Sequence, residues 1–354
     1  MKELRSILER AVAENASDIF LVAGRSVSVR KQGVIVQLDE EILVPADTEA
    51  LVKEIYRSAN ERDISGLETK GDDDFSFTMT GLSRFRVNAY RQRGALSAVI
   101  RIITFELPKP DQMGIPDYIL NLCDASKGMV LVTGSAGSGK STTLACMVNY
   151  INTTQKKHII TLEDPLEYLH RHDQSIVTQR EISTDTDSYV VALRATLRQS
   201  PDVILLGEMR DYETISVAIT AAETGHLVLS SLHTIGAAST VDRVIDVFPP
   251  HQQQQIRVQF ANVLEAVVSQ QLIPKADGSG RVAAFEVLHA NHAVRNLIRE
   301  AKSHQLMSVM QTNRKVGMIA MDEAIMQLYA GGQITKDMAI QFAQDPDGMT
   351  NKLH

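Results

Sequence analysis

Apolar residues in the first third of the chain recur at two spacings, which together predict a small domain of helices and strands. Leu4, Ile7 and Leu8 lie three or four positions apart or adjacent, so they share one face of a helix. Apolar positions on both sides of Gly81 alternate instead, which is the pattern of a β-hairpin. We therefore predict an α+β domain over residues 1–105, with strands at 18–23, 26–30, 34–38, 75–79, 85–89 and 95–105 and a helix at 48–57.

After Asp117 the apolar positions form short continuous runs that alternate with helical stretches. Such runs are typical of strands that have helices on both faces, as in an open α/β sheet. The predicted fold class is therefore α/β. We expect strands at residues 129–133, 158–162, 176–178, 203–206 and 227–231, and a turn between two further strands at 275–280. From residue 291 the pattern is helical only, so a helical C-terminal region is expected over about 291–345, followed by a polar tail.

The stretch Glu106–Pro116 separates the two patterns and contains three prolines and one glycine. Proline lacks the backbone donor that a helix interior or a central strand needs. We therefore predict a linker over residues 106–116 and a second domain over 117–354.

Bulk composition narrows the function classes. The 354 residues have room for two cores. The net charge of -7 argues against a protein whose main partner is nucleic acid, because such proteins carry a basic surplus. The two cysteines, Cys123 and Cys146, form no C-x-x-C pair, so no cysteine-based zinc site is expected. No apolar run reaches membrane-spanning length and the N-terminus has no signal-peptide core, so a cytoplasmic location is expected.

The strongest chemical signal is Gly134–Ser141, which fits the pattern G-x-x-x-x-G-K-[ST] between a predicted strand and a predicted helix. Glycines let backbone N–H groups turn toward a β-phosphate beside a helix N-terminus, which favours anions. Lys140 is expected to reach the β- and γ-phosphates, and the Ser141 hydroxyl to bind Mg²⁺. The predicted ligands are thus ATP and Mg²⁺, bound by Gly134, Ser135, Ala136, Gly137, Ser138, Gly139, Lys140, Ser141 and Thr142.

Two acids follow predicted strands downstream of this loop. Glu163 and Glu208 stand at carboxyl ends, where open α/β sheets bind ligands. Hydrolysis needs one group to hold Mg²⁺ and one to orient water. Either acid alone could instead be a solvated carboxylate that caps the N-terminal end of the next helix. Two such acids downstream of a phosphate loop favour a role in hydrolysis. His226 and His233 flank the strand at 227–231, and from the residues alone they are either structural or sensors of the γ-phosphate.

Arginines gather in the predicted hairpin of the first domain. Their side chains could cover a solvated sheet face with their aliphatic stems. They could also supply positive charge to phosphoryl transfer from a neighbouring domain or subunit. The arginines are Arg84, Arg86, Arg91, Arg93 and Arg101.

Motifs along nearly the whole chain resemble those of the secretion and pilus motor ATPases. They are Ala16–Ile19, Arg84–Asn88 with Gln92–Gly94, Thr161–Tyr168, Leu197–Asp211 and Ala222–Thr234. Within that family, Ala293–Lys302 resembles a segment characteristic of retraction motors. Two departures are Ser135-Ala136, where the family often has Pro-Thr, and Ala301, where it has glycine.

The resemblance implies a PAS-like first domain, a RecA-like second domain and a homo-hexameric ring. It implies Glu163 as general base, Glu208 as the Walker B acid near Mg²⁺, and His226 and His233 as reporters of the γ-phosphate. Arg86 and Arg101 would reach ATP when the two domains close.

For the cell, the resemblance implies a motor for type IV pilus retraction and twitching motility. Its partners would be an inner-membrane platform protein and the pilus machinery, at the cytoplasmic face of the membrane. Three other functions stay open on the sequence: an extension, secretion or DNA-uptake ATPase of the same family, a nucleic-acid translocase, and a non-catalytic regulator of a partner motor.

Overall fold

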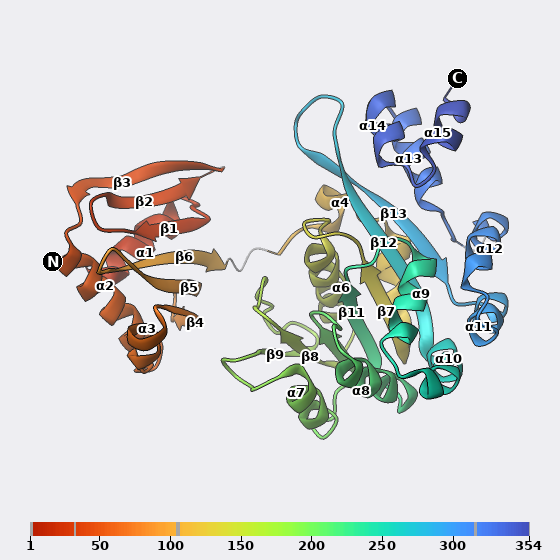
Figure 1. Cartoon of the computed structure of the whole chain (residues 1–354), viewed down its shortest axis with the longest axis horizontal. Coiled ribbons are helices and arrows are strands. Elements are labelled where there is room, and N and C mark those ends of the chain that lie inside the picture. Colours follow the sequence, from red (N-terminus) through yellow and green to blue (C-terminus); the bar gives the residue numbers. More distant parts are fainter. Residues whose placement is uncertain (1–2, 32, 104–106, 315–316, 354) are drawn as a thin grey trace. The chain divides into compact units, whose positions relative to one another are not determined.

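The chain folds into two compact units (Figure 1). The computed structural model describes residues 3–31, 33–103, 107–314 and 317–353. One unit comprises Met1–Glu106 with Leu166–Leu169, and the other comprises Leu107–Pro165 with His170–His354. The last residues of the strand predicted at 95–105, and the first residue of the predicted linker, Glu106, lie outside the described residues.

The first unit is an antiparallel sheet with the strand order β3-β2-β1-β6-β5-β4. Leu8 of α1 and Ile55 of α2 are fully buried in the same apolar cluster as Ile19 and Ile100 of the sheet. Its elements are α1 Leu4–Ala13, β1 Asp18–Leu21, β2 Ser26–Lys31, β3 Val34–Ile42, α2 Pro45–Ser58, α3 Ser65–Lys70, β4 Asp72–Met79, β5 Ser83–Gln92 and β6 Ala95–Ile103.

The predicted linker contains a short helix, α4 Pro110–Met113. Proline suits the first position of a helix because that N–H would be unpaired in any case, and Gly114 ends α4 with a positive φ of 66°. Ile115 is then buried against Ile119 of the second unit. The rule that proline breaks helices applies to their interiors, so it did not reveal this turn.

The second unit contains a mixed sheet with the order β13-β12-β7-β11-β10-β8-β9. Its strands are parallel except for β13, which forms an antiparallel hairpin with β12 at one edge. The predicted α/β class is confirmed. The strands are β7 Gly128–Thr133, β8 His158–Glu163, β9 Ile176–Glu181, β10 Val203–Leu206, β11 Leu227–Leu232, β12 Leu264–Pro274 and β13 Arg281–His289.

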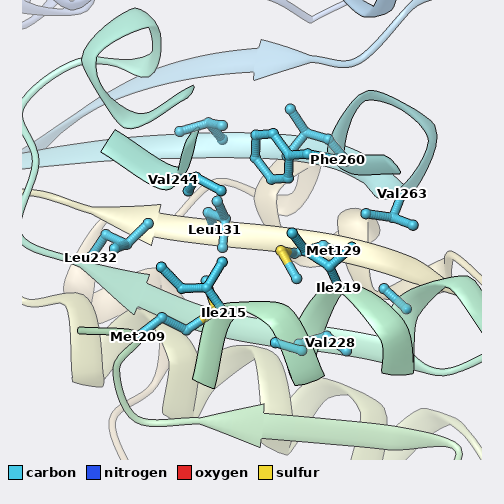
Figure 2. Close-up of a cluster of buried hydrophobic side chains, with 14 of the residues drawn as sticks. Met129, Leu131, Met209, Ile215, Ile219, Val228, Leu232, Val244, Phe260 and Val263 are labelled. Atoms are coloured by element: carbon cyan, nitrogen blue, oxygen red, sulfur yellow. The ribbon is translucent and has the colours of Figure 1, made fainter. Parts of the chain in front are cut away.

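Helices cover both faces of this sheet, which explains the continuous apolar runs. Met129 and Leu131 of β7 lie against Ile219 of α8 and Phe260 of α10 (Figure 2). The alternate residues of β7 belong to a second cluster, which contains Met147 of α6. The helices before β12 are α5 Asp117–Leu120, the 3₁₀ turn η1 Asn121–Asp124, α6 Lys140–Thr154, α7 Tyr189–Thr196, α8 Tyr212–Glu223, α9 Ala237–Asp246 and α10 Pro250–Val263.

From residue 291 the regular elements of the described chain are helices, and one isolated β-bridge pairs Ile319 with Val287. The predicted polar tail after Asp345 is wrong, because it forms a helix. The Asp345 carboxylate accepts a hydrogen bond from the Gly348 N–H at 2.9 Å, and Met349 is buried. The elements are α11 His292–Arg299, η2 Ser303–Gln305, α12 Leu306–Thr312, α13 Met321–Ala330, α14 Lys336–Phe342 and α15 Pro346–Lys352.

A row of polar residues crosses the β7–β12–β13 edge of the sheet. Ser269 on β12 pairs with Thr133 on one side and with Glu286 on the other. All three are almost fully buried. Helices α13–α15 pack their own apolar cluster onto the same hairpin, through Ile273 and Ala284 (Figure 1). Among the described helices, none has the length and apolar character that a membrane crossing requires.

Candidate functional site

The phosphate loop connects the end of β7 to the start of α6. Gly134 has a φ of +146°, and a Cβ on it would lie 2.4 Å from the backbone oxygen of Gln270. Gly139 precedes α6 with a φ of +90°, and a Cβ there would lie 2.8 Å from Gln270 Nε2. Gly134 is therefore required by space and by backbone conformation, whereas Gly139 is required chiefly by its left-handed backbone conformation.

Gln270 is a site residue that the sequence did not reveal. Its side chain is buried beneath the loop, and its Oε1 accepts a hydrogen bond from the Thr143 hydroxyl at 2.7 Å. Gln270 thus supports the loop from β12 and holds the first turn of α6. No local pattern marks it, because its partners lie far away in the sequence.

Lys140 lies at the centre of the loop. Its Nζ donates hydrogen bonds to the backbone oxygens of Gly134 and Ser135, both at 2.9 Å. It stands at the N-terminal end of α6, where the helix dipole adds positive potential. Ser138 Oγ is buried within the loop and has no hydrogen-bond partner among the described residues. A positive, N–H-rich cradle with an unsatisfied hydroxyl fits a phosphate group.

A chain of polar contacts leads from Lys140 to Glu208, the predicted Walker B acid. His233 Nδ1 lies 3.4 Å from Lys140 Nζ, and His233 Nε2 lies 3.2 Å from Glu208 Oε2. A neutral imidazole with its proton on Nε2 accepts from the lysine and donates to the carboxylate. Glu208 Oε1 also pairs with Arg210 at 2.5 Å, and this hydrogen bond, together with the carboxylate's charge, raises the pKa of Arg210. The structure thus brings Lys140, His233 and Glu208 together.

Glu163 ends β8, the strand beside β10. A Cβ on Gly207 would lie 3.4 Å from Glu163 Cα and 3.0 Å from the hydroxyl oxygen of Tyr189. Gly207 stands where an ordinary Walker B motif has aspartate. A Cβ there would be in ordinary contact with the backbone of Glu163 and would crowd the Tyr189 hydroxyl.

Tyr189 is a second residue that the sequence did not reveal. Burial raises its pKa, with smaller contributions from the negative charges of Asp164, Glu208 and Glu163. Asp164, Glu163 and Glu208 therefore lie close enough to Tyr189 to act on it, and Glu208 also reaches the phosphate loop through His233.

His226 lies at the amino ends of the parallel strands, whereas the phosphate loop lies at their carboxyl ends. It precedes β11, whose other end leads to His233, and six strand residues span about 20 Å. Its Nδ1 lies 2.9 Å from the backbone oxygen of Ala221, near the end of α8. His226 therefore does not reach the phosphate loop of its own chain, and its expected role as a reporter of a γ-phosphate stays a prediction. The contact with Ala221 supports the alternative interpretation, in which His226 is a structural residue.

In the first unit, Arg86 and Arg101 face each other on β5 and β6. Arg86 Nη2 pairs with Asp74 Oδ2 at 2.7 Å, and Arg101 Nε pairs with Asp18 Oδ1 at 3.1 Å. These four residues line a surface cavity of about 210 Å³. Each arginine is thus paired with an aspartate, and Asp18 also pairs with Arg30 at 3.4 Å. Neither aspartate was predicted as a site residue.

Taken together, a phosphate loop at a helix N-terminus and acids at two neighbouring strand ends define a P-loop ATPase. The chain matches the family model described as type II/IV secretion system protein over residues 1–323. The chain belongs to this family, so the predicted resemblance to secretion and pilus motor ATPases is confirmed, and so is the predicted ATPase activity.

Relatives and solved structures refine the comparison. The type IV pilus retraction ATPase PilT of Pseudomonas aeruginosa is 42% identical over 346 residues, which cover 98% of this chain and 99% of PilT. A twitching motility protein of Neisseria gonorrhoeae is 49% identical over 277 residues, 78% of this chain and 74% of that protein. A crystal structure of the pilus retraction motor PilT with bound ADP has a TM-score of 0.90 and 45% identity, with 99% of both chains covered.

Proposed function

We propose that this chain is a hexameric, Mg-ATP-hydrolysing motor that retracts type IV pili. The observation that carries the proposal is the polar chain Lys140–His233–Glu208 beside the phosphate loop. The likeness to retraction ATPases along almost the whole chain supports the same conclusion.

The proposed roles follow from position. Backbone N–H groups of the loop and Lys140 would hold the β- and γ-phosphates, and the Ser141 hydroxyl and Glu208 would hold Mg²⁺, with Glu208 acting partly through water. Bound Mg²⁺ supplies charge neutralisation to the phosphate oxygens. Glu163, at the end of β8, orients the attacking water and accepts its proton. His233 contacts both Lys140 and Glu208 and is therefore placed to report on the γ-phosphate.

For Arg86 and Arg101 the proposed role is to supply positive charge to the transferred phosphoryl group. Arg86 is partly buried and pairs with the exposed Asp74, whereas Arg101 is exposed and pairs with the buried Asp18. Solvent-exposed ion pairs contribute only about 0–1 kcal/mol. A phosphate can therefore compete for Arg86 while Asp74 stays solvated, and for Arg101 while Asp18 keeps Arg30 as a partner at 3.4 Å. We propose no contact between His226 and the phosphate loop of its own chain.

The proposed assembly is a ring of six copies at the cytoplasmic face of the membrane, docked on an inner-membrane platform protein of the pilus machinery. The PilT relatives are named as a pilus ATPase and a pilus retraction motor, which supports this setting. An acidic net charge of -7 gives no support to a nucleic-acid translocase.

Deletion with complementation tests the proposal. Cells without the gene should accumulate surface pili and lose twitching, and the wild-type chain should restore both. Lys140→Ala and Glu208→Gln should fail to complement, and the purified variants should lose turnover by about 10²–10³-fold, because each removes a charge from the phosphate site.

Glu9→Gln is a matched control, because Glu9 is an exposed carboxylate on α1 whose ion-pair partner among the described residues is Arg5. It should complement fully. Loss of surface pili on deletion would instead identify an extension motor. Turnover stimulated by DNA would favour the translocase.

A further inference from the structure

A carboxylate with no role in the proposed chemistry lies fully buried in β13. The side chain of Glu286 is 0% exposed. Its Oε1 accepts a hydrogen bond from the Ala237 N–H at 2.7 Å, and its Oε2 accepts one from the Met321 N–H at 3.2 Å. Ala237 is the first residue of α9 and Met321 is the first residue of α13. One side chain therefore joins the N-terminal ends of two helices.

The contacts compensate the burial of Glu286. Burial raises the pKa of this carboxyl, whereas the hydrogen bonds from Ala237, Met321 and Gln344 lower it. The Gln344 side chain provides its third donor at 3.4 Å. Each helix N-terminus carries partial positive charge that favours an anion. Because the protein supplies all of this solvation, loss of one donor leaves a buried acceptor unsatisfied, which is unfavourable.

One partner of Glu286 belongs to the loop that carries His233. Ala237 is four residues after His233. The Gly236 N–H donates to Ser269 Oγ at 3.0 Å, and Thr234 Oγ1 lies 2.7 Å from Thr240 Oγ1. The loop that carries His233 is thus hydrogen-bonded both to the sheet and to α9.

The other partners of Glu286 belong to the C-terminal helices. Asp322, next to Met321, accepts hydrogen bonds from the N–H groups of Gln344 at 2.6 Å and Asp345 at 3.1 Å. These residues lie between α14 and α15. The start of α13 therefore holds the chain that enters α15, and α13–α15 are connected to Glu286 as a group.

We propose that Glu286 is a positioning residue of the ATPase site, which couples the loop carrying His233 to the C-terminal helices α13–α15. When the γ-phosphate arrives or leaves beside His233, the start of α9 shifts, and Glu286 transmits that shift to Met321. The C-terminal helices then change position with each step of the ATP cycle. The inference rests on the proposed contact between His233 and the nucleotide.

Hydrogen exchange on the wild-type protein gives the first test. The protein is compared with saturating Mg-ADP and with a non-hydrolysable Mg-ATP analogue. We expect the exchange rates of residues 234–240 and of residues 321–345 to change together, each by about threefold or more, as local opening free energies shift. A response confined to residues 234–240 would overturn the inference, and this result does not depend on any variant folding.

Glu286→Gln gives the second test, because it keeps the side chain's size and replaces one acceptor oxygen with an NH₂ group that faces a donor. We expect the joint response to disappear and kcat to fall about tenfold, with the KM for ATP within about twofold. Glu323→Gln is the matched control, because Glu323 also lies on α13 and forms an ion pair with Arg314 at 2.8 Å. This variant should keep the joint response and a normal kcat. A folded Glu286→Gln protein with normal kcat and the joint response would also overturn the inference.

His233→Ala separates this inference from the assignment on which it rests. If His233→Ala turns over ATP like the wild type, the proposed role of His233 fails. A joint response of the two segments in the wild-type protein would still support coupling through Glu286. Loss of turnover in His233→Ala together with a joint wild-type response supports both.

Discussion

The backbone oxygen of Gln270 lies where a side chain on Gly134 would begin, at 2.4 Å from the position of its Cβ. A contact that short forces either the loop or β12 to move. Gly137, in the same loop, has open space around its Cβ position and only a positive φ of +75°. Two glycines three residues apart therefore have different reasons to be glycine.

Gly134→Ala should weaken ADP binding and slow turnover by about 100-fold, since a misplacement of about 1 Å near reacting groups has effects of this size. Gly137→Ala should lower the free energy of unfolding by only about 1 kcal/mol, the strain of the left-handed conformation, and leave binding within a few-fold. Calorimetric titration with ADP measures the affinity of both variants, and thermal melting measures the free energy of unfolding. Equal losses of affinity would show that the contact with Gln270 does not decide the position of the loop.

Site residues differ in how visible they are in the sequence. Lys140 and Ser141 are visible because one contiguous loop binds the phosphates. Glu208 is visible because it follows a buried strand. Gln270 and Tyr189 are not, since each reaches the site from a distant segment through a contact that no local pattern records.

At the scale of elements, the end of α11 shows how one substitution is accommodated. The Lys302 N–H donates to the Leu297 oxygen at 2.9 Å, and the Ala301 N–H donates to the Ile298 oxygen at 3.2 Å. This pair of bonds forms a Schellman motif, whose left-handed residue is usually glycine. Here it is Ala301, with a φ of +57°. Because Ala301 stands where the family has glycine, this end of α11 is strained.

Ala301→Gly should raise the free energy of unfolding by about 1 kcal/mol, because glycine adopts this conformation without the steric cost that alanine carries. Ala293→Gly, in the helical part of α11, is the matched control and should lower it by about 0.5–1 kcal/mol. Thermal melting of the purified variants tests the opposite signs. A destabilised Ala301→Gly protein would contradict this account of the helix end.

Element by element, the apolar runs of the second unit were the most predictable part, because strands covered on both faces leave little choice of residue. The predicted strand at 203–206 coincides with β10. The helix α15 was missed, although Asp345 and Pro346 are a capping residue and a first-position proline. His226 shows a second limit of prediction from sequence. The residues of β11 were predicted correctly, but not which end of that strand faces the phosphate loop.

At the scale of the whole molecule, the two units have separate apolar clusters, so each has a core of its own. Composition and the proline-rich stretch predicted two domains. The PAS-like character of the first stays a prediction. Six chains are a separate expectation, which came from the resemblance and not from any residue pattern, because a ring depends on surfaces between copies.

The ring has a direct test in solution. A chain of 39.0 kDa predicts an assembly of about 234 kDa, six times that mass, in the presence of Mg-ADP. Sedimentation velocity over a range of protein concentrations measures it. The surface variant Glu9→Gln should assemble in the same way. A species that hydrolyses ATP yet stays at the mass of one chain at every concentration would contradict the proposed ring.

The buried row Thr133–Ser269–Glu286 has a mechanical consequence. Neighbouring strands are about 4.8 Å apart, so two spacings, about 10 Å, separate the strand before the phosphate loop from the strand that holds α13. A load on the C-terminal helices would therefore have a second and short route to the phosphate loop, beside the one through the Glu286 side chain. It would run across the sheet along the inter-strand hydrogen bonds. On that route the stiffness of three paired strands, rather than the length of the intervening chain, would determine how much of the load reaches the loop.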